Sequence, residues 1–389
     1  MKEEINLKKQ LKIMLKNFFK DNIKNYWRNI DKTIFTTFLL LFILGVFFSF
    51  ASTSTLAGER LNKDYYFFFS KHLIFAISAI FLMILISSIH LEFFKKILLP
   101  IFIIALASLA LVLFFGVEVK GSKRWLNLFF FRFQPIEFVK PFFILIIAKI
   151  LSKDKFTTSN TSYFLSFFVL TLPCIILLNQ PDVGQTILLI LSWSTIVFVS
   201  GIKLIYIVSL FGLTIASVAG LLLIFPNKFS YIYQRIETFF DPSKGDSFQS
   251  NNALDAIREG GLTGQGMGEG TLKDRVPEAH TDYIISVIAE EFGSIISIFL
   301  ICIFLYISFR IVKFALSENE KFIKISLSGL ATLLIFQTFI HIGVNTSLLP
   351  TTGMTLPFLS YGGSSMIGSS ILAGIILNFT RRRFLNENY

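Results

Sequence analysis

Long apolar runs separated by short polar segments make up most of this chain. A helix needs about 20 apolar residues to cross the hydrocarbon core of a bilayer, and ten runs approach or reach that length. We therefore expect an all-α, polytopic membrane protein with about ten transmembrane helices in one membrane domain, residues 33–380. The expected spans are residues 33–52, 71–88, 98–116, 133–151, 163–178, 184–200, 204–225, 283–309, 322–344 and 364–379.

The composition agrees with this pattern and narrows the possible partners. Hydrophobic residues make up 53% of the chain and charged residues only 16%, whereas a soluble domain carries about 25% charged residues. The net charge of +11 is compatible with nucleic-acid binding, but the basic residues gather at the ends of the apolar runs, as membrane topology requires. We expect membrane lipids, and no nucleic acid, among the partners.

Charge also predicts the orientation of the chain. An even number of spans places both termini on the same side of the membrane. Nine Lys or Arg precede Thr33, and three arginines follow the last span at 381–383, so the positive-inside rule predicts cytoplasmic termini. The first tail, residues 1–32, has apolar residues at helical spacing between lysines, which is typical of a helix lying on an anionic membrane surface. Residues 381–389 form the second tail.

Two features of the outer side do not follow from topology. The segment from Lys120 to Arg132 carries four Lys or Arg on the side that usually lacks positive charge. The outer loop, residues 226–281, is about 56 residues long, whereas the other connections are mostly shorter than 20. It contains two predicted helices, 230–240 and 247–259, before a glycine-rich turn. Long loops on rigid scaffolds often carry function.

Five outer segments combine polar residues with glycine or proline. Under the expected topology they all reach one face of the membrane, although they are far apart in the sequence. This convergence predicts a functional site at the outer face. The segments are residues 121–125, 134–140, 180–186, 260–282 and 350–365.

The charged residues at two helix starts have two interpretations each. Glu137 and Lys140 are three residues apart and share a helix face, so they form either an ion pair at a helix start or the lining of a polar cavity; the two are compatible. Asp282 is either the N-cap of the following helix or a member of a site with Glu278 and His280.

Other polar positions give weaker signals. Asp182 is either a turn former or a site residue, and Ser364, at a Gly-Ser helix start, is suited to holding an anion. The glycine run at 260–270 follows no strand, so it fails the nucleotide-binding fingerprint and predicts a flexible loop. Glu290 and Glu291 are adjacent within an apolar span, so we expect at least one to point into the bundle and pair with a cation.

Five motifs in a fixed order suggest a family. In order and spacing they resemble the SEDS proteins (shape, elongation, division and sporulation), which are peptidoglycan polymerases. Ala279 and residues 352–357 are more similar to the division branch of that family than to its elongation branch. The motifs are Gly121-Ser-Lys-Arg-Trp125, Gln134-Pro-Ile-Glu-Phe-Val-Lys140, Gln180-Pro-Asp-Val-Gly184, Pro277-Glu-Ala-His-Thr-Asp282 and Leu356-Pro-Phe-Leu-Ser-Tyr-Gly-Gly-Ser-Ser365.

The resemblance implies a peptidoglycan glycosyltransferase of the bacterial inner membrane that acts at the division septum. It implies lipid II as substrate, and a division-type class B penicillin-binding protein transpeptidase and other divisome proteins as partners. It also implies that Asp282 is the essential catalytic acidic residue. We expect Asp282 to act as general base on the 4-hydroxyl of the acceptor sugar.

The resemblance further suggests how the substrate is held. Basic residues would bind the undecaprenyl pyrophosphate leaving group: Lys123, Arg124, Arg132 and either Lys273 or Arg275. A divalent cation, Mg²⁺ or Mn²⁺, would suit the same role, but no ligand cluster in the sequence identifies one. Further candidates for substrate binding are Trp125, Glu137, Lys140, Asp182, Glu278, His280, Tyr361 and Ser364.

Two other functions fit part of the pattern. A lipid II flippase explains the ten helices, the buried charges and the outer basic patch, but not an acidic residue at the outer surface beside a long loop. A non-catalytic divisome scaffold explains the partners, but it predicts that substitutions of Asp282 leave glycan synthesis intact.

Overall fold

Nine of the ten expected spans coincide with helices in the computed structural model. The structure describes residues 26–52, 67–119, 122–128, 131–152, 160–203, 230–241 and 248–381, with isolated positions between 205 and 220. The tenth expected span, residues 204–225, and most of both predicted tails lie outside these described ranges. The nine helices are α2 (Lys32–Ser52), α4 (Phe67–Ser88), α5 (Leu91–Phe115), α6 (Ile136–Leu151), α7 (Asn160–Asn179), α8 (Val183–Val199), α12 (Ile284–Ser317), α13 (Lys321–Asn345) and α14 (Gly363–Phe379).

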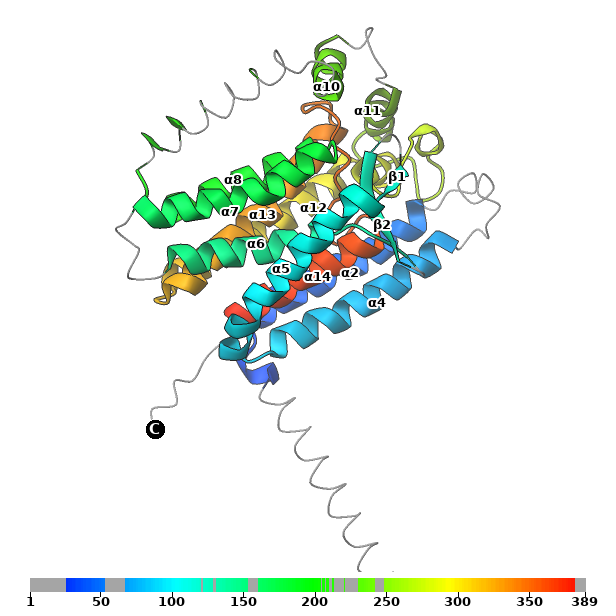
Figure 1. Cartoon of the computed structure of the whole chain (residues 1–389). Coiled ribbons are helices and arrows are strands. Elements are labelled where there is room, and N and C mark those ends of the chain that lie inside the picture. The colour runs from blue at the N-terminus through cyan, green and yellow to red at the C-terminus, as the bar shows by residue number, and fades with distance from the viewer. Residues whose placement is uncertain are drawn as a thin grey trace, which may run out of the picture.

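The helices form a bundle with a buried centre and a lipid-facing rim (Figure 1). The buried share of the apolar span is 78% in α13 but only 28% in α4 and in α5. Large apolar side chains on the rim helices point outward, among them Phe81 on α4 and Ile104 on α5. Because the solvent around a membrane bundle is hydrocarbon, such exposed apolar faces are the expected surface of a polytopic protein.

Helix α2 begins and helix α14 ends on the same side of the bundle, which we call the termini end (Figure 1). Both Nη2 contacts of Arg310 at the end of α12 go to the Asp31 carboxylate before α2, at 3.1 and 2.9 Å. Asn378 at the end of α14 donates to the Ile89 carbonyl after α4, at 2.6 Å. This arrangement agrees with the expectation of an even number of spans.

The opposite end of the bundle, which we call the loop end, carries a small antiparallel sheet. Its strands are β1 (Val117–Val119), β2 (Ser122–Leu128) and β3 (Phe131–Phe133), in the order β1-β2-β3. The register pairs Glu118 with Lys123 and Asn127 with Arg132. Since β3 occupies the start of the expected fourth span, α6 begins three residues later than expected, at Ile136.

The described part of the long loop covers the same end. It contains α10 (Ser230–Phe240), α11 (Phe248–Gly260) and a short 3-10 turn, η2 (Lys273–Arg275). The first two confirm the helices expected within this loop. Helix α11 packs against α12, beside the sheet (Figure 1).

Part of the glycine run at residues 260–270 packs closely against α12, and the expectation of a flexible loop stays a prediction. The amides of Gln265 and Gly266 donate to the carbonyls of Glu290 and Glu291, at 2.9 and 3.0 Å. A Cβ on Gly260 would lie 1.9 Å from the Ala289 carbonyl oxygen. The absence of a side chain at Gly260 therefore allows the close approach of two backbones.

Candidate active site

Asp282 lies at the loop end, immediately before α12. Its amide donates to the Glu278 carbonyl at 3.1 Å, and Asn345 Nδ2 donates to the Asp282 carbonyl at 3.0 Å. The cap residue of α12 is Tyr283, which makes no side-chain cap hydrogen bond. Asp282 therefore lies one residue before the cap position of α12.

Arg124 reaches the same region from β2. Its guanidinium donates from Nε to the Gln180 carbonyl at 3.3 Å and from Nη2 to the Pro181 carbonyl. Nε also lies 3.7 Å from the Asp182 carboxylate, and the Arg124 side chain is only 11% exposed. These contacts fix the guanidinium plane and leave Nη1 for the Asp282 side.

Gly353 marks the point at which the two charged groups meet. A Cβ on this residue would lie 3.4 Å from Asp282 Oδ2 and 3.6 Å from Arg124 Nη1. The carboxylate and the guanidinium therefore border the same space, and their atoms are no farther apart than the sum of these two distances. Residues far apart in the sequence thus place an acid beside a cation.

The segment that carries Gly353 is non-helical and enters the bundle between α13 and α14. Phe358 in this segment is buried against Phe38 and Phe42 of α2. The Met354 carbonyl lies 2.7 Å from Nδ1 of His341. Non-helical backbone at membrane depth is tolerated where protein covers it, so this packing holds Gly353 in place.

Asp182 combines the two interpretations that its sequence left open. It caps α8, because its side chain accepts from the Gln185 amide at 3.4 Å. It also lies beside Arg124, which extends the cationic site to the turn between α7 and α8. Burial raises the pKa of Asp182, and the neighbouring Arg124 opposes that shift.

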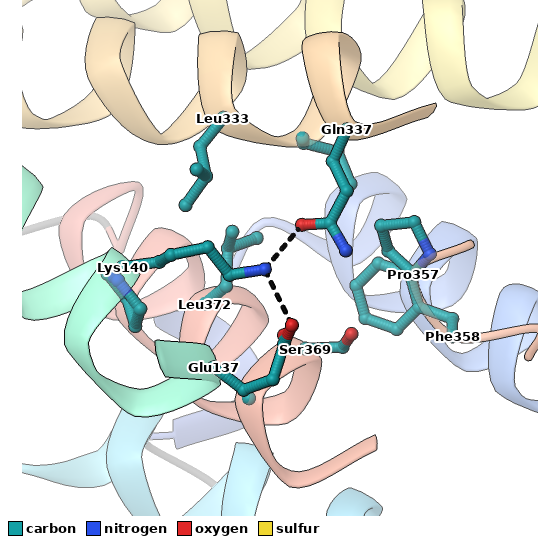
Figure 2. A pocket seen from close by; sticks show the side chains of 11 residues that line it. Glu137, Lys140, Leu333, Gln337, Pro357, Phe358, Ser369 and Leu372 are labelled. Carbon is teal, nitrogen blue, oxygen red and sulfur yellow. Dashed lines mark hydrogen bonds and ion pairs between the residues drawn. The ribbon is translucent and has the colours of Figure 1, made fainter. Parts of the chain in front are cut away.

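Glu137 and Lys140 form the expected ion pair inside the bundle (Figure 2). Lys140 Nζ donates to Glu137 Oε1 at 2.8 Å and to Gln337 Oε1 at 2.9 Å, and both charged side chains are at most 4% exposed. Gln185 Nε2 donates to the same Glu137 oxygen at 3.3 Å. The adjoining cavity is about 10 Å³, enough for about one water molecule, so it is too small for a sugar.

His280 and Tyr361 meet in an aromatic cluster on the α4 side of Asp282. The Tyr361 amide donates to the His280 carbonyl at 2.8 Å, and the ring centroids are 5.5 Å apart. Phe68 of α4 contacts both rings. Burial raises the pKa of Tyr361. Glu278, with a positive φ of 58°, accepts from the Thr281 hydroxyl at 3.1 Å.

Two of the predicted substrate-binding residues have structural partners. Lys273 pairs with the buried Glu291, which confirms that one glutamate of this pair binds a cation. The Ser364 hydroxyl accepts from the Gln134 amide at 2.9 Å and donates to the Arg132 carbonyl at 3.1 Å. It therefore joins the start of α14 to the start of α6.

The remaining predicted residues lie on the sheet. Lys123 is exposed and Trp125 is half-buried, both on β2 with Arg124. Residues 120, 121, 129 and 130 lie outside the described part of this sheet. Lys123 and Arg132 are thus exposed basic residues of the sheet that also carries Arg124, and their role in substrate binding stays a prediction.

Sequence reasoning missed several polar contributors. Gly353 lies in the predicted segment 350–365, but the sequence did not single it out within that segment. Gln185, Gln337 and Asn345 are amides within or at the ends of apolar spans, and such polar residues in a membrane bundle are a signal in themselves. In the part of the chain that the structure describes, no group of three His, Cys, Asp or Glu comes together as a metal site.

The chain is similar over most of its length to known proteins. The profile of the FtsW/RodA/SpoVE family, described as "Cell cycle protein", matches residues 31–384. A protein from Caulobacter vibrioides named "Probable peptidoglycan glycosyltransferase FtsW" is 34% identical over 359 residues, which cover 92% of this chain and 91% of that protein. A protein of the same name from Haemophilus ducreyi is 34% identical over 356 residues, covering 89% and 88%.

Solved structures share the fold. One of them was solved as part of work on the structural coordination of polymerization and crosslinking by a peptidoglycan synthase complex. It has a TM-score of 0.74 at 25% identity, and the match covers 90% of this chain and 97% of that chain. The rod shape determining protein RodA of Thermus thermophilus has a TM-score of 0.67 at 24% identity, with 90% and 96% covered. The relatives' shared name identifies a glycosyltransferase, and the apolar helices identify a multi-pass inner-membrane protein. The chain belongs to the FtsW/RodA/SpoVE family of cell cycle proteins.

Proposed function

We propose that this protein polymerises lipid II into glycan strands at the outer face of the cytoplasmic membrane, with Asp282 as the general base. The observation that carries the proposal is the placement of the Asp282 carboxylate and the Arg124 guanidinium around one point, at Gly353. An acid beside a fixed cation is the arrangement needed for a reaction that removes a proton from one sugar while a pyrophosphate leaves another.

The chemistry divides between these two groups. Asp282 accepts the proton of the acceptor 4-hydroxyl as that oxygen attacks the anomeric carbon of the donor sugar. Attack opposite the leaving group inverts that carbon. Pyrophosphate departs as a stable anion, so it needs a cation more than a protonating acid. Arg124, already oriented by carbonyls, supplies that charge together with Lys123 and Arg132 on the sheet.

We assign no step to a metal ion. Binding of Mg²⁺ or Mn²⁺ at the pyrophosphate stays a prediction. Among the described residues, no group of three His, Cys, Asp or Glu comes together as a metal site. The aromatic rings of His280 and Tyr361 lie 5.5 Å apart, and aromatic rings are suited to packing against a sugar.

The orientation, location and partners are part of the same proposal. Lysines at the termini end, such as Lys95 and Lys149, support a cytoplasmic location for that end under the positive-inside rule. The loop end then faces the outside, where lipid-linked sugars are polymerised. We propose septal localisation with a class B penicillin-binding protein, which is supported by the similar structure that comes from a peptidoglycan synthase complex.

The test uses purified full-length protein with lipid II in detergent, where no membrane remains to be crossed. Asp282→Asn should lower the polymerisation rate about 10²- to 10⁴-fold, the usual contribution of a general base. The matched control is Asp255→Asn on α11, whose side chain is 56% exposed, and it should polymerise at the native rate. Both variants should elute and melt like the native protein.

The outcomes separate the competing functions. Native-rate polymerisation by folded Asp282→Asn would disprove the base assignment. Absence of glycan from the native protein, together with lipid II transport in vesicles, would identify a flippase. Intact septal glycan synthesis in cells carrying only Asp282→Asn would favour a scaffold.

A further inference from the structure

A second polar cavity lies at the termini end of the bundle, away from the site around Asp282. Its volume is about 520 Å³. Three lysines from three helices line it, Lys95 of α5, Lys149 of α6 and Lys321 of α13, with Glu320 as the single carboxylate in the lining. The remaining lining residues are Ser152, Asn319 and Phe322.

Internal contacts position two of these lysines at the cavity. Lys95 Nζ lies 2.7 Å from Glu320 Oε1 and 3.1 Å from Glu92 Oε1. Lys149 Nζ donates to the Lys95 carbonyl at 3.0 Å, which brings this lysine close to the start of α5. Glu320 makes no side-chain cap for α13, so the first turn of that helix adds partial positive charge.

An apolar stripe continues from the cavity along the surface of α5. Leu99 and Ile103 are four and eight residues after Lys95, so the three share a helix face. Leu99 is 51% exposed and Ile103 is 56% exposed. The cavity lies where the apolar spans end, which is the depth of lipid headgroups, and the stripe lies at the depth of acyl chains.

We propose that this cavity binds the phosphate of an anionic phospholipid, with an acyl chain along Leu99 and Ile103. Basic pockets between transmembrane helices at the membrane surface bind such headgroups. The combination of a cavity, three converging lysines and an adjoining lipid-facing stripe distinguishes this site from a general basic surface. The proposal does not depend on the reaction at Asp282.

Native mass spectrometry of the full-length protein in detergent tests the proposal, with phosphatidylglycerol and phosphatidylcholine added at equal concentration. We expect retention of phosphatidylglycerol and little retention of phosphatidylcholine. Each of Lys149→Gln and Lys321→Gln should weaken phosphatidylglycerol binding about fivefold, since one lysine near an anionic surface contributes about 1 kcal/mol. The double variant should weaken it roughly thirtyfold on the same basis.

Matched variants separate a built site from surface charge. Lys149→Arg and Lys321→Arg keep the charge and should keep binding. Lys313→Gln removes an exposed lysine of α12 that does not line the cavity, and it should bind like the native protein. Equal weakening by Lys313→Gln, or undiminished binding by the folded double variant, would overturn the proposal. Displacement of the lipid by millimolar inorganic phosphate would assign the cavity to free phosphate instead.

Discussion

Gly353 offers the most direct test of the geometry around Asp282, because alanine there would place a methyl group between the two charged side chains. The residue has a φ of +66°, and a non-glycine residue in the left-handed region costs about 1–2 kcal/mol. The added Cβ would lie 3.4 Å from Asp282 Oδ2 and 3.6 Å from Arg124 Nη1, which are ordinary contacts. Gly353→Ala should therefore fold with a modest loss of stability.

Polymerisation by Gly353→Ala should nevertheless fall about 100-fold, because the methyl group would occupy space that the substrate needs, and a displacement of the bound substrate by about 1 Å has that effect. The assay measures the initial rate of glycan formation from lipid II in detergent, together with the melting temperature. The control is Gly261→Ala: Gly261 has a φ of +57° and nothing within 4 Å of an added Cβ. It should lose a similar amount of stability and keep its rate. Equal rates in the two variants would refute the assignment of this space to the reaction.

Three further substitutions test the supporting contacts. Arg124→Lys cannot reproduce the fork that donates to two carbonyls, so lipid II polymerisation should fall at least tenfold while the melting temperature changes little; an unchanged rate would contradict the role given to Arg124. Lys140→Met leaves the buried Glu137 without its cation and should destabilise the fold by about 3 kcal/mol or more. The double variant Glu137→Gln with Lys140→Met removes the buried charge as well, so it should melt at a higher temperature than Lys140→Met alone. Gly260→Ala should yield little folded protein on size-exclusion chromatography, because its Cβ would lie 1.9 Å from the Ala289 carbonyl, and normal yield would show that α11 can shift.

The sequence predicted the helices well because hydrophobicity alone determines them. An apolar run of about 20 residues has few alternatives in a bilayer, so the expected ends agree with α2, α8 and α14 to within one residue. It predicted the start of α5 poorly. Lys95 and Lys96 suggested that the loop between the second and third spans continues to residue 97. The helix already begins at Leu91, and both lysines lie in its first turns at the termini end.

The site was predictable only in part, for a physical reason. Each charged residue carries its own local signal, so Asp282, Arg124 and the Glu137–Lys140 pair could be named. Which of them meet depends on backbone packing between distant segments. The close approach at Gly353 and the packing of Gly260 against α12 depend on the absence of a side chain, and a glycine in the sequence does not say which distant segment it approaches.

This site contains charged residues that would take part in the reaction and polar residues that hold them in position. Asp282 and Arg124 are fixed largely through backbone groups: the carbonyls of Gln180 and Pro181 orient the guanidinium, and the Asn345 amide holds the Asp282 carbonyl. Replacing a charged side chain should therefore remove chemistry and leave the scaffold intact. The Asn345 side chain accepts from the Ser286 hydroxyl at 2.8 Å and donates to the Asp282 carbonyl, so it joins the start of α12 to the end of α13. Replacing Asn345 should therefore move the Asp282 carboxylate without removing it. The positions of the charges, more than their number, then determine how well the bundle can align an acceptor hydroxyl with a departing pyrophosphate.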